Sequence, residues 1–313
     1  MTVICLDLGG TIIKIGLIEN GKIIASERIN SQSVIGLKPS LPAIEKSVHN
    51  LLNQSDVVLQ QIEGIGISFP GLVDTKEMKV LSTNKKYQDA EDINFKKWAQ
   101  EKFDLPVFME NDARMALIGE WQYGAGKDVD NIVMITLGTG VGGATLINGK
   151  LLRGKHFQAG CLGGHFTVRV NGNQCTCGNI GCVEAEASSW RVSQIITNHP
   201  LYSSSSISDK KPDFESLFMC ADDGDELSIS IREECMEVWA AGIISQIHAY
   251  DPELIIMSGG VMKSADIILP FIREKINRLA WTPWGEVKIV ASEVPDESSL
   301  LGAYALVSNK ALQ

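Results

Sequence analysis

The sequence predicts an α/β fold made of two structurally related halves, and three observations predict it. Two distant stretches, DLGGTIIKIGLIENGKII and TLGTGVGGATLINGKLL, align almost throughout with one gap. After each stretch, short apolar runs typical of buried strands alternate with helix-like segments. The chain has 313 residues, 44% of them hydrophobic, which suffices for two cores of ordinary size.

The first stretch is predicted to be a β-meander over residues 2–29. Residues 2–8 form an apolar run, a Gly-Gly-Thr turn follows, and residues 12–18 form a second apolar run. Asn20-Gly21 then precedes a third strand, and this dipeptide is the strongest short signal for a hairpin.

The glycine turn of this meander is a candidate anion site. Gly9 and Gly10 allow backbone N–H groups to approach a phosphate, and the hydroxyl of Thr11 adds a donor. Asp7 is placed to orient a metal-bound water. Lys14 is either a phosphate contact or a solvated strand residue, and such a turn taken alone is most often only a turn.

The second stretch repeats the pattern. Residues 131–137 form an apolar strand, Gly138-Thr139-Gly140 turn it, and Asn148-Gly149 close the next hairpin. We expect the two glycine turns to face one cleft and to hold different parts of a polyphosphate. Thr136 stands where the first half has Asp7, so the halves are not equivalent in function.

Between the hairpins the sequence predicts a helix over 39–60, a buried strand over 64–74 that turns at Pro70-Gly71, and a strand over 106–110. Asn111 and Asp112 follow that strand and precede a helix. An Asn or Asp at this point is either an N-cap or, for Asp112, a general base that must reach the attacking hydroxyl.

The helices and strands from residue 185 onward are predicted from the spacing of apolar residues and from residues that end helices. Helices are expected over 185–199, 227–250 and 299–312, and strands over 253–262 and 286–292. Asp251-Pro252 end the long helix, and a polar, serine-rich loop is expected over 201–213.

A compact set of metal-ligand types lies between 165 and 184. It consists of His165, Cys175, Cys177 and Cys182. One imidazole and three thiolates complete tetrahedral Zn2+ with no open position, so the ion would be structural. The alternatives are a reduced cysteine cluster and a disulfide. Glu186 is expected to be either a solvated carboxylate or a carboxylate at the start of a helix.

Composition and charge argue against several classes of protein. The net charge of −10, without a Lys/Arg block, argues against nucleic-acid binding. No run approaches the roughly 20 apolar residues of a membrane span. The N-terminus starts a strand within three residues and is not a secretory signal. A soluble, cytoplasmic protein is therefore expected.

The paired glycine-turn hairpins resemble the superfamily of sugar kinases, heat-shock chaperone ATPases and actin, and the Cys175–Glu184 segment CTCGNIGCVE resembles the zinc signature of the ROK family. The resemblance covers nearly the whole chain. It implies two actin-like (ribonuclease H-like) domains with a cleft between them. The first would span 1–118, with the helix of about 299–313 packed back on it. The second would span 119–298 and carry the zinc loop 165–184.

The resemblance also implies roles for individual residues. Glu110-Asn111-Asp112-Ala113 matches the catalytic motif, which makes Asp112 the base. Gly259-Gly260 resembles the adenosine motif. ATP, catalytic Mg2+ near Asp7 and structural Zn2+ would be the cofactors. The implied sugar contacts are Pro70, Gly71, Asn84, Asn111, Asp112, His165 and Glu184.

The chain departs from the family at one place. The usual pattern is Ala-Gly-Glu, one apolar residue, Gly and His, whereas this chain has Ala159-Gly160-Cys161-Leu162-Gly163-Gly164-His165. One residue is added, and the sugar-binding Glu of the family pattern is missing. A carboxylate bond of this kind contributes roughly 1.5–3 kcal/mol, so the choice of sugar is open.

The function expected is ATP-dependent phosphorylation of a hexose, at the 6-hydroxyl of glucose or a relative, by a homodimer. Another hexose or an N-acetylhexosamine is an alternative substrate. A non-catalytic sugar-binding regulator and an actin-like ATPase are alternative classes. Family repressors carry a helix-turn-helix domain before the first hairpin, and here that hairpin starts at residue 2.

Overall fold

The computed structural model describes residues 1–83 and 85–312. Contacts divide the chain into two compact units. The first comprises Met1–Asp128, Lys150–Cys161 and the segment from Glu293 onward. The second comprises Val129–Gly149 and Leu162–Ser292.

The sheet of the first unit has the strand order β3-β2-β1-β4-β7. Its antiparallel pairs are β1 with β2 and β2 with β3, and its parallel pairs are β1 with β4 and β4 with β7. The bounds are β1 (Thr2–Leu8), β2 (Ile12–Glu19), β3 (Lys22–Asn30), β4 (Ile62–Phe69) and β7 (Val107–Asn111). A separate ribbon pairs β5 (Leu72–Asp74) with β6 (Lys79–Ser82).

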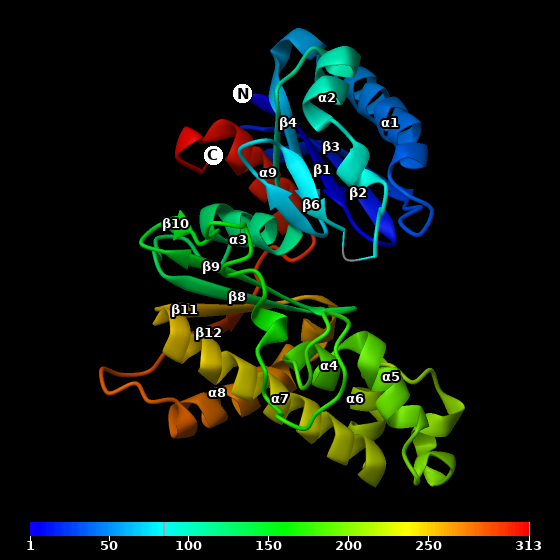
Figure 1. The fold of residues 1–313 in the computed structure, drawn as a ribbon, viewed down its shortest axis with the longest axis vertical. Coiled ribbons are helices and arrows are strands. Elements are labelled where there is room, and N and C mark those ends of the chain that lie inside the picture. The colour runs from blue at the N-terminus through cyan, green and yellow to red at the C-terminus, as the bar shows by residue number, and fades with distance from the viewer. Residues whose placement is uncertain (84, 313) are drawn as a thin grey trace. The chain divides into compact units, whose positions relative to one another are not determined.

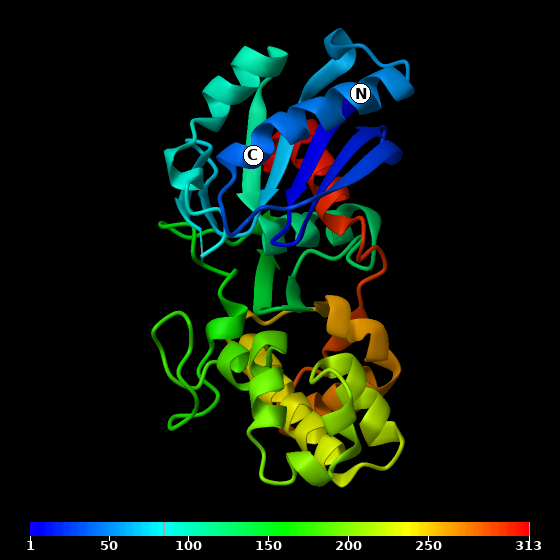
Figure 2. The same cartoon turned by 90° about the vertical axis from the view of Figure 1, so that its right-hand side faces the viewer.

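Helices cover both faces of this sheet, because β1 is apolar on both sides. Alternate residues of a strand point to opposite faces. Ile4 and Leu6 belong to one core cluster with α1 (Leu41–Gln54) and α2 (Phe95–Phe103). Val3 and Cys5 belong to another with α3 (Asp112–Tyr123) and α9 (Ser298–Ser308). Figure 2 shows α1 along one face of the strands and α9, in red, on the other.

The second unit repeats this plan. Strand β8 pairs antiparallel with β9 and parallel with β11, which pairs parallel with β12. The bounds are β8 (Ile132–Leu137), β9 (Val141–Ile147), β11 (Leu254–Ser258) and β12 (Lys288–Ala291). The short β10 (Lys150–Leu151) follows β9 in the chain. The predicted pair of related halves is confirmed.

The helices of the second unit share one large core with its strands, and Figure 1 shows α7 and α8 running beside each other next to the sheet. Their bounds are α4 (Val183–Ala187), α5 (Ser189–Thr197), α6 (Phe214–Asp222), α7 (Glu226–Tyr250) and α8 (Ala265–Leu279). Within the described residues, no helix is both long and apolar enough to cross a bilayer.

Both Asn-Gly turns are confirmed, with positive φ at the two central residues, 49° and 76° at Asn20-Gly21 and 49° and 67° at Asn148-Gly149. Some helix limits were wrong. The helix expected over 39–60 ends at Gln54, because Asp56 is left-handed with φ of 53°. The helix expected over 185–199 is split at Ser188, whose φ and ψ of −104° and 167° are extended.

Other limits were also wrong. The strand expected over 253–262 ends at Ser258. The helix expected over 299–312 ends at Ser308, because Asn309 is extended with φ and ψ of −119° and 104°. The loop expected over 201–213 contains two short 3-10 helices, Tyr202–Ser204 and Ser206–Asp209.

Candidate active site

The glycine turn of the first unit has no room for larger side chains. A Cβ added to Gly9 would lie 2.4 Å from the carbonyl oxygen of Ile12, which is a clash with backbone. The N–H of Gly9 donates to the carbonyl of Asp7 at 3.0 Å, and Thr11 is exposed beside them. The turn therefore offers a tightly folded, open backbone of the kind that binds anions.

Asp7, at the end of β1, is held by two groups. The hydroxyl of Ser68 donates to its Oδ1 at 2.9 Å, and the Nζ of Lys14 lies 3.8 Å from its Oδ2. Burial raises the pKa of Asp7, while Lys14 and Ser68 lower it. The same Nζ donates to the carbonyl of Asp296 at 2.9 Å, so Lys14 already has partners on its own unit.

The sequence did not reveal the side chains that hold the Gly9-Gly10 turn by hydrogen bonds. The hydroxyl of Tyr87 donates to the carbonyl of Gly9 at 2.7 Å and lies 2.7 Å from the hydroxyl of Ser31. The hydroxyl of Ser33 donates to the carbonyl of Gly10. Tyr87 is fully buried, so the turn is fixed from behind by side chains far from it in sequence. No local pattern in the sequence signals these contacts.

The sequence left two roles open for Asn111 and Asp112, helix N-cap and general base, and the structure assigns the N-cap to Asn111. Asn111 is the N-cap of α3, because its side-chain oxygen accepts from the N–H of Arg114 at 3.2 Å. Its amide donates to Asp112 at 2.9 Å and to the carbonyl of Gly71 at 3.0 Å. Asp112 is the first helical residue and is therefore not needed as the cap.

Asp112 has the electrostatics of a general base. Its pKa is raised to about 6, mainly by burial and to a smaller extent by the charge of Asp7. The N–H of Ala113, which donates at 2.8 Å, the charge of Lys86 and the amide of Asn111 lower it. A carboxylate with a pKa near the working pH is ionised at neutrality and still basic enough to accept a proton.

The turn after β4 packs tightly against the ribbon. A Cβ added to Gly71 would lie 2.1 Å from the carbonyl of Ser82, so only glycine fits there. Pro70 precedes it and is buried. Asn84, the remaining expected sugar contact of this region, lies outside the described residues.

A buried ionic network involves Glu110 and Arg114, which lie two residues before and two residues after Asp112 in the chain. Glu110 has no exposed side-chain surface, and its two oxygens meet Arg114 at 3.3 Å and Arg153 at 2.7 Å. Arg114 also donates to the carbonyls of Phe157 and Ala159, at 3.0 and 2.6 Å. The network ties the loop before Cys161 to the helix that begins at Asp112.

Cys161, which follows Ala159-Gly160, is buried. Burial raises the pKa of its thiol, Arg114 lowers it, and the carboxylates of Glu110 and Asp112 raise it again. The thiol is therefore neutral and lies near Asp112.

In the second unit the glycine turn is joined to Glu184. Its Oε2 accepts from the N–H of Val141 at 3.0 Å, and a Cβ on Gly140 would lie 2.3 Å from the same oxygen. The carbonyls of Gly138 and Thr139 accept from the first N–H groups of α5, at 3.2 and 3.1 Å. Glu184 thus lies against the turn.

The His/Cys loop gathers its four expected ligands. Their ligand atoms all lie within 4.8 Å of one another. The Sγ of Cys175 is 3.6 Å from Nδ1 of His165, and the Sγ atoms of Cys177 and Cys182 are 3.7 Å apart. Tetrahedral zinc with Zn–S near 2.3 Å and Zn–N near 2.0 Å requires about 3.6 Å and about 3.8 Å, so the residues fit the ion.

Glu186 braces this loop. The alternative of a solvated carboxylate was wrong, and the alternative of a helix-start carboxylate is confirmed, because Glu186 lies in the first turn of α4. It is only 4% exposed. Its oxygens accept from the backbone N–H and the side-chain amide of Asn173 and pair with Arg169 at 3.4 Å. A buried carboxylate is retained here because each oxygen has a donor.

Gly259 and Gly260 directly follow β11, although the expected strand over 253–262 included both. Gly259 has φ of 98°, and a Cβ there would lie 2.2 Å from the carbonyl of Leu137. Gly260 opens onto a cavity of about 410 Å³ lined also by Phe214 and Phe218 of α6 and by Val261. The cavity lies wholly within the second unit, and charged residues such as Asp222 and Lys263 line it beside the aromatic ones.

Two units of the same plan, each opening with a glycine-turn hairpin, define a protein of the two-domain actin-like fold. The ROK family profile matches residues 3–310, and the chain belongs to the ROK family.

Relatives within the family include kinases and regulators. The chain is 30% identical to the glucokinase of Thermotoga maritima over 318 residues, covering 99% of this chain and 98% of that one. The structure of a Streptomyces griseus ROK glucokinase with glucose and AMPPNP is 28% identical, with a TM-score of 0.80 and 98% and 99% of the two chains covered. The xylose repressor of Bacillus subtilis is 27% identical over 87% of this chain and 69% of its own.

Proposed function

We propose that this protein is an ATP-dependent sugar kinase that phosphorylates the 6-hydroxyl of glucose or a related hexose. The observation that carries the proposal is Asp112, a partly buried carboxylate whose pKa is raised to about 6, in the unit that also holds the glycine turn. In the proposed reaction the sugar oxygen bonds to the γ-phosphorus as the bond to the β-phosphate oxygen breaks. The hydroxyl proton passes to Asp112, and ADP leaves.

The proposed nucleotide contacts come from three segments. Gly9, Gly10 and Thr11 would hold one part of the triphosphate, and Gly138, Thr139 and Gly140 would hold another. Mg2+, held largely by phosphates and water near Asp7, would neutralise the phosphate charge when bound. The cavity beside Gly260 has the aromatic walls and flat backbone that suit a purine.

The proposed sugar contacts are Asn111, Asp112, His165 and Glu184, with the Pro70-Gly71 turn and Asn84. Structural Zn2+ on His165, Cys175, Cys177 and Cys182 would fix the loop that carries His165 and precedes Glu184. Because the sugar-binding Glu of the family is missing near Cys161, one charge-assisted bond to the sugar would be lost unless another residue supplies it, and another hexose or an N-acetylhexosamine is the alternative substrate.

A coupled ADP assay over glucose, mannose, fructose, allose and N-acetylated hexosamines tests the proposal. We expect sugar-dependent ADP release that falls at least a hundredfold in Asp112→Asn. Equal activity in Asp112→Asn would remove Asp112 from the mechanism. ADP release that does not depend on sugar would instead favour the actin-like ATPase class.

A second candidate is a sugar-binding regulator without catalysis, which the 27% identity to a xylose repressor favours. The net charge of −10 disfavours contact with nucleic acid by this chain alone. Sugar-dependent retention of DNA, together with no ADP release from any sugar, would support this candidate. The proposed homodimer is tested by light scattering across a concentration series.

A further inference from the structure

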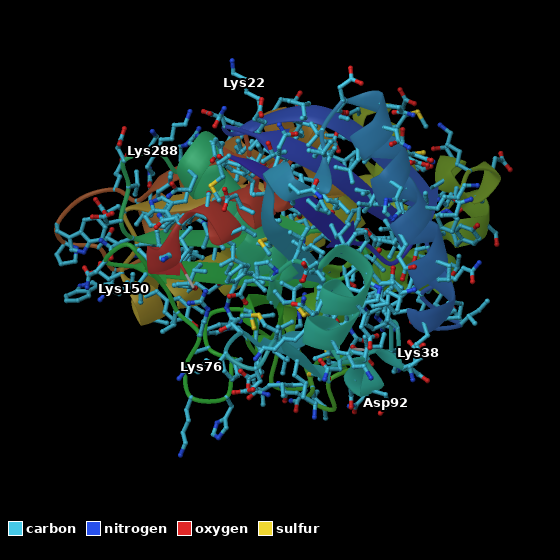
Figure 3. The ribbon with its side chains drawn as sticks, turned by 90° about the horizontal axis from the view of Figure 1, so that it is seen from above. Lys22, Lys38, Lys76, Asp92, Lys150 and Lys288 are labelled. Carbon is cyan, nitrogen blue, oxygen red and sulfur yellow. The ribbon has the colours of Figure 1, made fainter. Side chains whose placement is uncertain are left out.

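A second lysine faces the glycine turn of the first unit, and the proposed function does not use it. A Cβ added to Gly10 would lie 3.0 Å from Cε and 3.2 Å from Nζ of Lys86. Lys86 follows β6 and is half-buried, unlike the exposed Lys22 and Lys38 that Figure 3 labels on the outside of the molecule.

The ammonium group of Lys86 has no hydrogen-bond or ion-pair partner among the described residues. Within residues 1–83 and 85–312 no carboxylate oxygen lies within 4.0 Å of its Nζ, and this Nζ makes no hydrogen bond to them. Lys14 differs, because it donates to Asp296 and pairs with Asp7. A half-buried cation beside an anion-type turn is therefore available for a ligand.

The loop that carries Lys86 is fixed to the turn it faces. The N–H of Lys86 donates to the carbonyl of Thr83 at 2.9 Å, and the N–H of Tyr87 donates to the carbonyl of Ser33 at 2.7 Å. The Tyr87 hydroxyl bonds to the carbonyl of Gly9. These contacts limit how far Lys86 can move from the turn.

Lys86 also lies close enough to Asp112 to influence it. The positive charge of Lys86 lowers the pKa of Asp112, against the effects of burial and of Asp7. One ammonium group is thus placed to act on the anion bound at the turn and on the carboxylate that receives the proton.

We propose that Lys86 is a catalytic residue whose ammonium group contacts the phosphoryl group in transit between the glycine turn and the acceptor hydroxyl. This inference rests on the proposed kinase function. Lys86 keeps its proton throughout and donates to the equatorial oxygens of the phosphoryl group, where charge is concentrated in the transition state. The hydroxyl proton goes to Asp112, and the electron pair of the broken bond leaves with ADP.

The experiment compares Lys86→Met and Lys86→Arg with Lys85→Met in the full chain. Lys85 is the exposed neighbour on the same loop, so its replacement removes the same charge. We expect Lys86→Met to lower kcat about 100-fold with the sugar KM within about threefold. Lys86→Arg should recover part of the loss, and Lys85→Met should stay within twofold of the parent.

The pH profile separates this role from a structural one. The N–H of Ala113, Asp7, Lys86 and the Asn111 amide are the groups that act on the pKa of Asp112, and Asp112 in turn raises the pKa of the nearby Cys161 thiol. Loss of the Lys86 charge should move the acidic limb of kcat/KM to higher pH, whereas Lys85→Met should not. An unchanged kcat in Lys86→Met overturns the proposal. So does a rise in sugar KM alone, which would place Lys86 on the sugar.

Failure of the kinase function has a different signature. If the parent protein releases no ADP with any sugar, Lys86 is judged by titrating MgATP and MgADP in a calorimeter. We then expect the parent to bind ATP more tightly than ADP and Lys86→Met to lose that difference. Equal behaviour of Lys86→Met and Lys85→Met would overturn the role of Lys86 independently of catalysis.

Discussion

The Nη1 atom of Arg114 lies 3.3 Å from Oε1 of Glu110, and neither side chain has any exposed surface. Glu110 lies near the end of β7 and Arg114 lies in the first turn of α3, so the pair flanks Asp112 in the chain. Arg153 reaches the other oxygen of Glu110, and Arg114 also holds two carbonyls of the loop before Cys161. Asp112 is therefore flanked in the chain by the members of a buried ionic network.

Replacing Arg114 should destabilise the fold strongly. Arg114→Ala leaves the carboxylate of Glu110 buried with a single cation and removes the donors of two carbonyls. Breaking a buried pair from one side costs about 3–5 kcal/mol. Urea unfolding should show this decrease in the free energy of unfolding. The control is Arg278→Ala, which breaks an i,i+4 pair with Glu274 whose side chains are both 57% exposed. It should cost less than about 0.5 kcal/mol, and similar costs for the two variants would contradict the argument.

The pH dependence of the reaction should report Asp112. The base must be ionised to accept a proton, and its pKa is raised to about 6. In the parent, kcat/KM should therefore be level above about pH 7 and fall about tenfold per unit below pH 6. Asp112→Asn should abolish this limb along with the activity, and it keeps a side-chain acceptor for the N–H of Ala113. A profile level down to pH 4.5 would show that another group accepts the proton.

Asp112 should also affect stability, with a sign that follows from its raised pKa. The folded state binds the proton more tightly than the unfolded state, so ionisation of Asp112 disfavours folding as pH rises through about 6. Asp112→Asn should therefore unfold at higher urea than the parent at pH 8, and the difference should vanish below about pH 4. Activity and stability would then change in opposite directions for the same residue.

The sequence predicted those parts of the fold that depend on local chemistry. Asn20-Gly21 and Asn148-Gly149 are hairpin turns because both residues tolerate positive φ. The end of α1 was missed because Val57 and Leu59 continue an apolar pattern past Asp56, whose left-handed backbone stops the helix.

Only those residues of the candidate site that belong to a local sequence motif could be predicted. Asp112 follows a motif that can be read in one stretch of sequence. Lys86 and Tyr87 could not be assigned, because they meet the glycine turn across about eighty residues of chain, and nothing near them in sequence indicates that contact.

Removing one thiol should release the proposed zinc. The parent should contain one zinc ion per chain by elemental analysis, and Cys177→Ser should contain close to none and melt at lower temperature, because structural zinc contributes folding energy. Cys220→Ala is the control, because Cys220 is a buried free thiol of the same unit outside the cluster. It should keep the metal. Zinc bound equally by both variants would contradict the assignment.

Tyr87 should keep the Gly9-Gly10 turn rigid through its hydrogen bond to the carbonyl of Gly9. Tyr87→Phe removes the donor to the carbonyl of Gly9, a bond of 2.7 Å, and a partner of Ser31. Loss of a buried bond costs about 1–2 kcal/mol, and a looser turn should weaken ATP binding several-fold with little change in sugar KM. Tyr202→Phe is the matched control, because its hydroxyl also meets a backbone carbonyl, that of Ser208, but at 3.5 Å and away from the turn. It should cost less stability and leave ATP affinity unchanged. If both variants bind ATP as the parent does, the rigidity of the Gly9-Gly10 turn does not limit nucleotide binding, and the hydrogen bond from Tyr87 serves stability alone.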